Sequence, residues 1–268
     1  MPLPQGNALM PAFPKPRALS APFATARPRL AVFGDSHYAC IRMAHGLGLV
    51  DLSGLEVEYW GHVGRRFNFL DCKDGVILPK DDYTAQRFAK FNENGRTSLP
   101  AAEFDVILFA GARIDVTDLM ISLLGAQVSG QFLSQGLKRR MARDRLHALM
   151  AYQFAQDFAA HAEALVVLSP VSFPTVGSPK SPAARTDPLR DCTAADRAKL
   201  WDLMAEVAAE DGLLLIPQPE ETVVNGVFTS ADFAVDGYLE RADYAHRNAA
   251  FGAAVMRQVL ALLKVGIV

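Results

Sequence analysis

Short apolar runs alternate with longer amphipathic segments along most of the chain. Five of the runs are rich in Val, Ile, Leu or Phe and have the length of strands: 29–33, 55–60, 104–110, 164–168 and 213–217. The segments between them place apolar residues at helical spacing and predict helices over 37–47, 116–124, 130–162, 193–211 and 242–263. The stretch 61–100 is rich in charge, Gly and Asn, and we expect it to be irregular.

Strands that alternate with helices predict an α/β fold whose parallel sheet is covered on both faces. Right-handed crossovers make this an open, doubly wound, three-layer α/β/α domain with a five-stranded parallel sheet, which we expect to span 29–268. Ligands of such sheets bind beyond the carboxyl ends of the strands. Four segments lie there: Gly34-Asp35-Ser36, 61–64, 111–115 and the loop before the last helix.

The segment 1–28 is expected to be an arm outside this domain. It holds seven prolines, which interrupt every candidate apolar core of a secretory signal. No run in the chain approaches the roughly 18 apolar residues of a membrane span. We therefore expect no membrane partner and a cytoplasmic location.

Composition narrows the classes of function. Half of the 268 residues are apolar and 21% are charged, which is typical of a globular protein. A net charge of −2 gives no basic footprint for nucleic acid. Cys40, Cys72 and Cys192 are odd in number and form no CxxC pair, so neither a disulfide framework nor a metal site is expected. The chain also lacks a P-loop, a GxGxxG motif after a strand and an HExxH motif.

Ser36 follows the first strand directly and precedes the first helix. The N–H groups at a helix N-terminus favour developing negative charge, so a hydroxyl there is well placed for nucleophilic chemistry. Asp35 and Ser36 are also common N-cap residue types, which a strand-to-helix turn favours without any catalytic role. The tripeptide alone leaves both interpretations open.

The second candidate pair, Asp243 and His246, precedes the last predicted helix. A nucleophilic serine needs a base to take its proton, and that base needs a carboxylate to orient it. An Asp three residues before a His can fold back to hold Nδ1, which leaves Nε2 to face Ser36. A capping Asp beside an exposed His is the alternative, but both groups map to the strand-end face where Ser36 lies.

In this order along the chain, these blocks resemble the SGNH/GDSL hydrolase superfamily. The resemblance covers about 29–263 and implies a flavodoxin-like three-layer fold. It implies Ser36 as nucleophile, completed by Asp243 and His246, with the Ser36 N–H as one oxyanion donor. Gly64 best matches the oxyanion glycine that follows the second strand, with Gly61 as the alternative.

One block departs from the family pattern. Gly111-Ala112-Arg113 puts Arg113 where the family has an asparagine that binds the oxyanion. Arg113 could replace that donor, because a guanidinium donates several hydrogen bonds and carries charge. It could equally bind an acidic group of the substrate, or pair with Asp115 and weaken the site.

Further positions are candidates for substrate binding because they lie in the same blocks: Asp35, His37, Gly61, His62 and Gly111. His37, directly after the serine, is similar to the Gly-Asp-Ser-His variant of SGNH domains linked to carbohydrate O-acylation. It could equally be an ordinary residue of the first helical turn.

Three functions follow from the resemblance. The first is a serine esterase that cleaves an ester, such as an acetyl ester of a carbohydrate or small molecule, through an acyl-serine. The second is an O-acyltransferase with the same triad, for which acetyl-CoA would be the acyl donor; no other cofactor is expected. The third is a catalytically silent SGNH-like domain that binds a glycan or a protein. The sequence specifies neither the substrate nor an oligomeric state.

Overall fold

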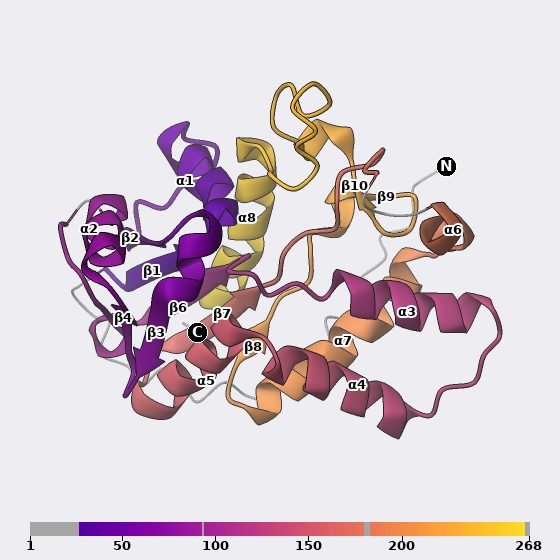
Figure 1. Cartoon of the computed structure of the whole chain (residues 1–268), viewed down its shortest axis with the longest axis horizontal. Helices are drawn as coiled ribbons and strands as arrows, with labels where there is room; N and C mark the ends of the chain where they lie inside the picture. The colour runs from indigo at the N-terminus through magenta and orange to yellow at the C-terminus, as the bar shows by residue number, and fades with distance from the viewer. Residues whose placement is uncertain (1–26, 93, 180–182, 266–268) are drawn as a thin grey trace.

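A five-stranded parallel sheet forms the centre of the molecule (Figure 1). The computed structural model describes residues 27–92, 94–179 and 183–265, so most of the expected arm lies outside the described residues. Every neighbouring pair in the order β2-β1-β6-β7-β8 is parallel. The strands are β1 (Arg29–Gly34), β2 (Glu56–Gly61), β6 (Val106–Ala110), β7 (Leu165–Ser169) and β8 (Leu214–Leu215). This arrangement confirms the predicted fold class.

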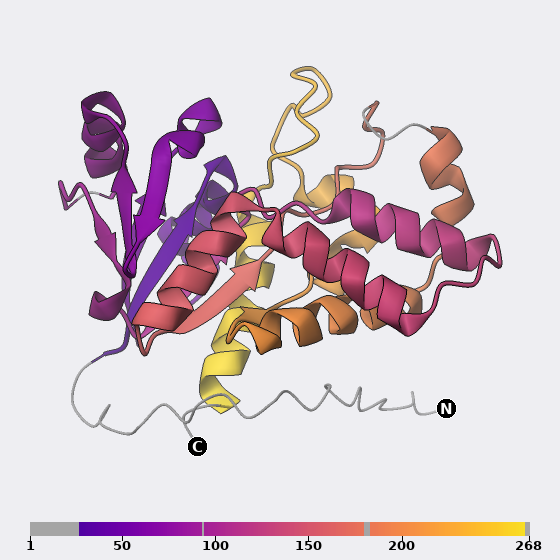
Figure 2. The same cartoon turned by 60° about the horizontal axis from the view of Figure 1, so that its bottom comes forward.

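Helices cover both faces of the sheet (Figures 1 and 2). Successive residues of β1 belong to different hydrophobic clusters. Leu30 and Val32 pack with α1 (Ala39–Gly46) and α8 (Ala249–Val265). Ala31 and Phe33 belong to the larger core on the opposite face. The helices of that face are α3 (Thr117–Val128), α4 (Gln135–His147), α5 (Met150–His161) and α7 (Ala194–Glu210). Because side chains alternate along a strand, a buried strand contributes apolar side chains to the core on each face of the sheet.

The stretch after β2 is ordered, which corrects the expectation of an irregular 61–100. Strands β3 (Leu70–Lys73) and β4 (Val76–Pro79) form an antiparallel hairpin, joined by β5 (Leu99–Pro100), and α2 (Asp82–Phe91) packs beside them. The hairpin turn is Asp74-Gly75, where both residues have positive φ, as a type I′ turn requires. Asp81 caps α2 by accepting from the Thr84 N–H at 2.7 Å.

Two predicted helices have different bounds in the structure. The segment 130–162 contains two helices, α4 and α5, because Leu149 adopts an extended conformation between them. The last helix begins at Ala249 rather than 242. Asn248 accepts from the Phe251 N–H at 3.2 Å and so caps α8, which leaves the preceding residues as a loop.

The remaining boundaries are close to those expected. A capping box of Thr193 and Asp196 opens α7, close to the predicted helix start at 193. A 3₁₀ turn, Ser36–Tyr38, precedes α1, and another, Gly64–Phe69, follows β2. Short elements complete the chain: α6 (Ala183–Thr186), β9 (Val223–Val224) and β10 (Phe228–Thr229). Within the described ranges, no helix combines the length and apolarity that crossing a bilayer requires.

The strand order determines where a ligand site is expected. The chain leaves β1 for β2 on one side and returns to β6 on the other, so the direction of winding reverses between β1 and β6. In open α/β sheets a crevice forms at such a switch point, beyond the carboxyl ends of the strands. Gly34 ends β1 and Ala110 ends β6, and these two residues are register partners. The segments that follow them form the two sides of the crevice.

Helices α1 and α8 pack with almost no space between their backbones. A Cβ added at Gly252 in α8 would lie 2.2 Å from the Cys40 carbonyl oxygen in α1. Gly125 in α3 has nothing within 4 Å of the same added atom. We predict that Gly252→Ala destabilises the protein by about 1–3 kcal/mol, since overpacking forces the backbones apart.

Gly125→Ala is the matched control, and it should stabilise the protein by about 0.5–1 kcal/mol through the lower helix propensity of glycine. Urea denaturation of both variants measures the two effects. Equal free energies of unfolding in the two variants would contradict the close α1–α8 contact.

Candidate active site

Ser36 lies at the end of β1, in the first position of the 3₁₀ turn that leads into α1. Its N–H belongs to the first turn of this segment, where backbone donors have no partner within the helix. Asp35 caps the turn by accepting from the His37 N–H at 3.2 Å. The local sequence thus fixes the Ser36 backbone between a buried strand and a capped turn.

Asp243 and His246 lie in the loop before α8, where the chain folds back on itself. The Asp243 carboxylate accepts from the backbone N–H of His246 at 3.1 Å and from Nδ1 of its ring at 2.8 Å. Because a carboxylate only accepts, Nδ1 carries a proton, and in the neutral ring Nε2 then carries the lone pair. Nε2 lies 2.8 Å from Ser36 Oγ, so it can accept the hydroxyl proton. The structure thus brings together Ser36, His246 and Asp243, the three residues that we expected to form a triad.

The charge of Asp243 is maintained by the same hydrogen bonds. Burial by itself would raise the pKa of this carboxyl, but the backbone and ring N–H groups of His246 outweigh it and hold the pKa below its usual range. The carboxylate is therefore charged at neutral pH, as it must be to orient the imidazole and to stabilise an imidazolium.

Arg247, which sequence reasoning missed, anchors the His246 loop. Its side chain is buried, and Nη1 donates to the carbonyl oxygen of His246 at 3.0 Å and to Thr175 Oγ1 at 2.8 Å. Nε donates to Ser172 Oγ at 2.8 Å. Burial lowers the pKa of Arg247 to about 10, so the guanidinium stays charged at neutral pH. An arginine next to a candidate histidine was visible in the sequence, but its burial was not.

Gly64 begins the 3₁₀ turn after β2, and its φ of +63° lies in the region that glycine adopts without strain. Its N–H, like that of Ser36, opens a helical turn and has no partner within it. Gly61, the alternative for this role, ends β2 instead, and a Cβ added there would lie 1.8 Å from the Gly34 carbonyl oxygen. The glycine at 61 therefore permits close packing of two strands.

Arg113 holds the turn that begins at Gly64. Its Nη2 donates to the Gly64 carbonyl oxygen, and its Nη1 donates to Asn68 Oδ1 at 2.9 Å. Its Nε lies 3.8 Å from Asp35. The Asp115 side chain instead accepts from the Thr117 N–H at 2.9 Å. These contacts give Arg113 a role that differs from the three expected from the sequence: it positions the loop that carries Gly64.

Asn68 is a second residue that sequence reasoning missed. An arginine only donates, so the atom facing Arg113 must be the amide oxygen, and the amide nitrogen remains as a donor. Position 113, where the resemblance led us to expect an asparagine, holds an arginine, and this arginine fixes the side chain of Asn68. The sequence showed this asparagine within 61–100 but gave no sign that it pairs with Arg113.

Asp35, His37 and Gly111 form one packed unit. Asp35 is buried and accepts from His37 Nδ1 at 2.7 Å. Burial alone would raise the pKa of Asp35, but the hydrogen bond and charge of His37 lower it below its usual range. Gly111 has a φ of +66°, and a Cβ there would lie 2.5 Å from that of His37. The centroid of the His37 ring lies 5.6 Å from that of the His246 ring, so this unit adjoins His246.

His62 is buried rather than open to the crevice. Its Nδ1 lies 3.0 Å from the Val63 carbonyl oxygen, and its ring packs edge-on against Phe91 at 5.7 Å. Burial lowers the pKa of His62, which favours its neutral form. His62 therefore packs the loop, and it is not exposed for the substrate contact that we expected.

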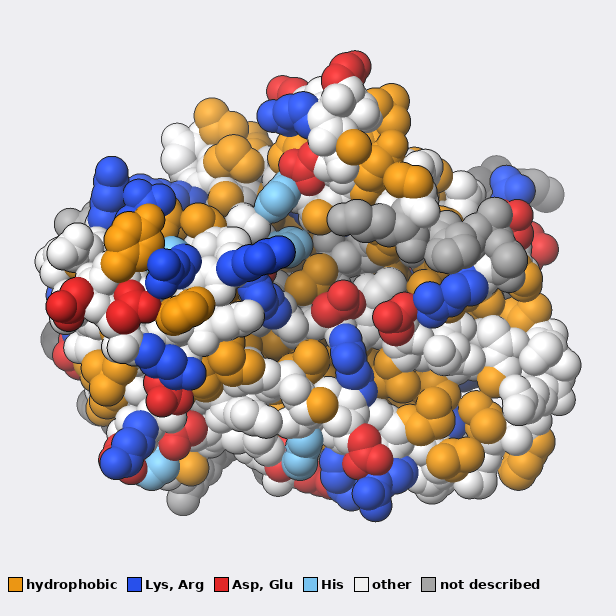
Figure 3. Space-filling model, in the orientation of Figure 1, with side chains coloured by type: hydrophobic (Ala, Val, Ile, Leu, Met, Phe, Trp, Pro, Cys, Tyr) orange, Lys and Arg blue, Asp and Glu red, His pale blue; other side chains and the backbone are white. Residues whose placement is uncertain are grey.

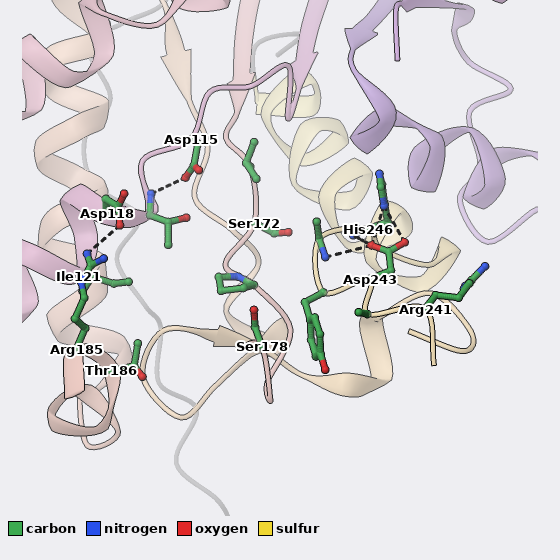
Figure 4. Close-up of a pocket in the computed structure, with 16 residues that line it drawn as sticks. Asp115, Asp118, Ile121, Ser172, Ser178, Arg185, Thr186, Arg241, Asp243 and His246 are labelled. Atoms are coloured by element: carbon green, nitrogen blue, oxygen red, sulfur yellow. Dashed lines mark hydrogen bonds and ion pairs between the residues drawn. The ribbon is translucent and has the colours of Figure 1, made fainter. Parts of the chain in front are cut away.

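A cleft of about 560 Å³ opens beside Asp243 and His246 (Figure 4). It lies between the start of α3, the loop after β7 and the loop before α8. Asp115, Asp118 and Arg185 line the end away from His246, where Arg185 pairs with Asp118 at 2.9 Å. The lining is rich in charged and hydroxyl side chains, so the cleft suits a polar group.

The chain was compared with known proteins. No model of a known protein family matches it, and no curated protein matches it. Among solved structures, it is similar to an extracellular lipase from Streptomyces rimosus, with 15% identity and a TM-score of 0.43 over 87% of this chain and 98% of that chain. It is also similar to a carbohydrate acetylesterase family member from Sinorhizobium meliloti, with 14% identity and a TM-score of 0.36 over 89% and 98%.

A third similar structure is a DUF4886 family protein from Bacteroides uniformis, with 8% identity and a TM-score of 0.34 over 75% of this chain and 76% of that chain. Likenesses this distant carry no argument about activity.

The contacts of Arg113 generate a prediction about the Gly64 turn. We predict that Arg113→Met speeds amide hydrogen exchange in 64–69 by about tenfold, because two hydrogen bonds from a charged donor are lost. Exchange measured by mass spectrometry on peptides from this segment checks the prediction. Arg140→Met is the control, since among the residues that the structure describes Arg140 pairs only with Asp144, one turn along α4. Unchanged exchange in Arg113→Met would show that other contacts hold the turn.

Proposed function

We propose that the protein is a serine ester hydrolase with Ser36 as its nucleophile. The observation that carries the proposal is the continuous hydrogen-bonded chain from Asp243 through His246 to Ser36, with 2.8 Å at each of its two steps. A nucleophile within reach of a base, and a base oriented by a third group, is the arrangement that covalent acyl transfer requires. A protein that only binds a glycan or a partner needs no such chain.

The reaction follows from the proton positions. His246 Nε2 takes the Ser36 hydroxyl proton while Oγ attacks the ester carbonyl carbon. The tetrahedral intermediate then collapses, the bond to the alcohol oxygen breaks, and Nε2–H returns the proton to that oxygen. In the second half, His246 takes a proton from water, and the hydroxide attacks the acyl-serine. The acid leaves, and Ser36 recovers its proton from His246.

The oxyanion is stabilised by the N–H groups of Ser36 and Gly64 in this proposal. Both open a helical turn and so offer donors without a partner inside that turn. Arg113 acts as a positioning residue by holding the Gly64 carbonyl oxygen. The side-chain amide of Asn68 is the candidate for a third donor.

The polar cleft beside His246 supports an alcohol that carries hydroxyl or charged groups, such as a carbohydrate. Asp115 lines it, and its carboxylate accepts one backbone N–H within the protein. Carboxylates can accept further hydrogen bonds from sugar hydroxyls. We propose hydrolysis rather than transfer to a second alcohol, because water needs no binding site beyond the ones described.

We predict that Ser36→Ala and His246→Ala each lower kcat/KM for p-nitrophenyl acetate by at least about 10³-fold, since a triad acts as a unit. His161→Ala is the matched control. His161 forms another Asp–His pair four residues apart, with Asp157 at 3.4 Å, on α5 and outside the site. Release of p-nitrophenol by the purified, folded variants measures the effect. Turnover by Ser36→Ala at the wild-type rate would exclude the proposed nucleophile.

A further inference from the structure

The surface on the α1 side of Ser36 differs in character from the cleft beside His246. A groove of about 450 Å³ begins at Ser36 and runs along α1. Apart from Ser36 and Arg42, its lining is apolar: Tyr38, Ala39, Met43, Val63 and Phe91. His246 and Asp243 line the opposite cleft and do not line this groove. Ser36 therefore borders a groove with few polar side chains, while the cleft that His246 lines is rich in charged and hydroxyl side chains.

The apolar surface continues along α1 beyond the groove. Ala39, Met43 and Leu47 are spaced four residues apart, which places them on one face of the helical segment. Met43 is 42% exposed and Leu47 is 69% exposed. Leu49, at 49%, follows in the next turn of the chain. Figure 3 shows hydrophobic side chains gathered over α1. At a rise of 1.5 Å per residue, Ala39 to Leu47 spans roughly 12 Å.

The position of His246 decides which part of an ester faces which side. During acylation, Nε2–H must deliver its proton to the leaving alcohol oxygen, so the alcohol lies over His246. The cleft that His246 lines thus receives the alcohol. The acyl chain is attached to the same tetrahedral carbon and points away from His246. In that direction lies the groove that Ser36 lines and His246 does not.

The geometry points to an ester that joins an apolar acyl chain longer than acetyl to a polar alcohol, with the acyl chain in the groove of Tyr38, Ala39, Met43, Val63 and Phe91. This inference rests on the proposed function and narrows its substrate class. An acetyl group would reach only the first part of the groove and would leave Met43 exposed. A longer chain covers it and removes apolar surface from water.

The test varies the acyl chain while the leaving group stays the same. We expect kcat/KM of the wild-type protein to rise from p-nitrophenyl acetate through butyrate to hexanoate, by up to about fourfold per buried methylene, which corresponds to about 0.8 kcal/mol. Met43→Gln should lower the ratio of hexanoate to acetate at least about threefold, because the groove becomes polar. The ratio is taken within each variant, so a general loss of activity or of folded protein cancels.

Leu137→Gln is the matched control. Leu137 is an exposed helical residue like Met43, at 45%, but it lies on α4. Its variant should keep the wild-type ratio of hexanoate to acetate. A second series, ethyl, butyl and hexyl acetate, varies the alcohol instead, and Met43→Gln should leave the chain-length dependence of this series as in the wild type.

The outcomes separate the two proposals. Ser36-dependent hydrolysis that is fastest for acetate would overturn the inference and leave the proposed function standing. A Met43→Gln variant that changes the alcohol series rather than the acyl series would also overturn it, because the groove would then hold the alcohol. If the wild-type protein hydrolyses no ester of either series, the proposed function fails and the inference fails with it.

Discussion

The site depends most on one buried charge, the guanidinium of Arg247. Placing a charged group in the interior is costly unless its donors are all paired, so the surrounding chain must supply acceptors. The acceptors come from two loops that are distant in sequence: Ser172, Phe173 and Thr175 after β7, and Tyr244 and His246 before α8. Satisfying this one side chain therefore draws the two loops together.

Arg247 also affects the proposed nucleophile, Ser36, through its neighbour in sequence, His246. Arg247 fixes the backbone of His246, Asp243 fixes its ring, and the ring then faces Ser36. The same loop after β7 forms one side of the cleft, so Arg247 bonds two of the segments that line it. Side chains on loops tend to be mobile, and this pairing holds the imidazole of the proposed base in one position.

The opposite side of the crevice is fixed by close packing rather than by charge. Glycines at 61 and 111 let the strand ends approach each other and let His37 pack against the backbone. The contact of α1 with α8 at Gly252 joins the helix after Ser36 to the helix after His246. Arg113 then holds the Gly64 turn against this frame. Each candidate group thus has a separate physical cause for its position.

Much of the fold could be predicted from the sequence because buried parallel strands are continuous apolar runs. The site-bearing segments followed from the strand ends, since Ser36 and Arg113 directly follow apolar runs. The ordered hairpin at Asp74-Gly75 was missed because its turn signal was read as part of a polar, irregular stretch. Arg247 and Asn68 could not be found, because an arginine or asparagine in a sequence carries no sign of which distant acceptor it meets.

The central claim, that His246 and Asp243 activate Ser36, is tested most directly by the rate of covalent labelling with a fluorophosphonate. The site of labelling is mapped by peptide mass spectrometry on the wild type and on Asp243→Asn, in which the imidazole remains but loses its orienting charge. The account predicts labelling at Ser36 in the wild type and a rate about 10³–10⁴-fold lower in the variant. Equal rates in the two folded proteins, or labelling at a serine other than Ser36, would contradict it.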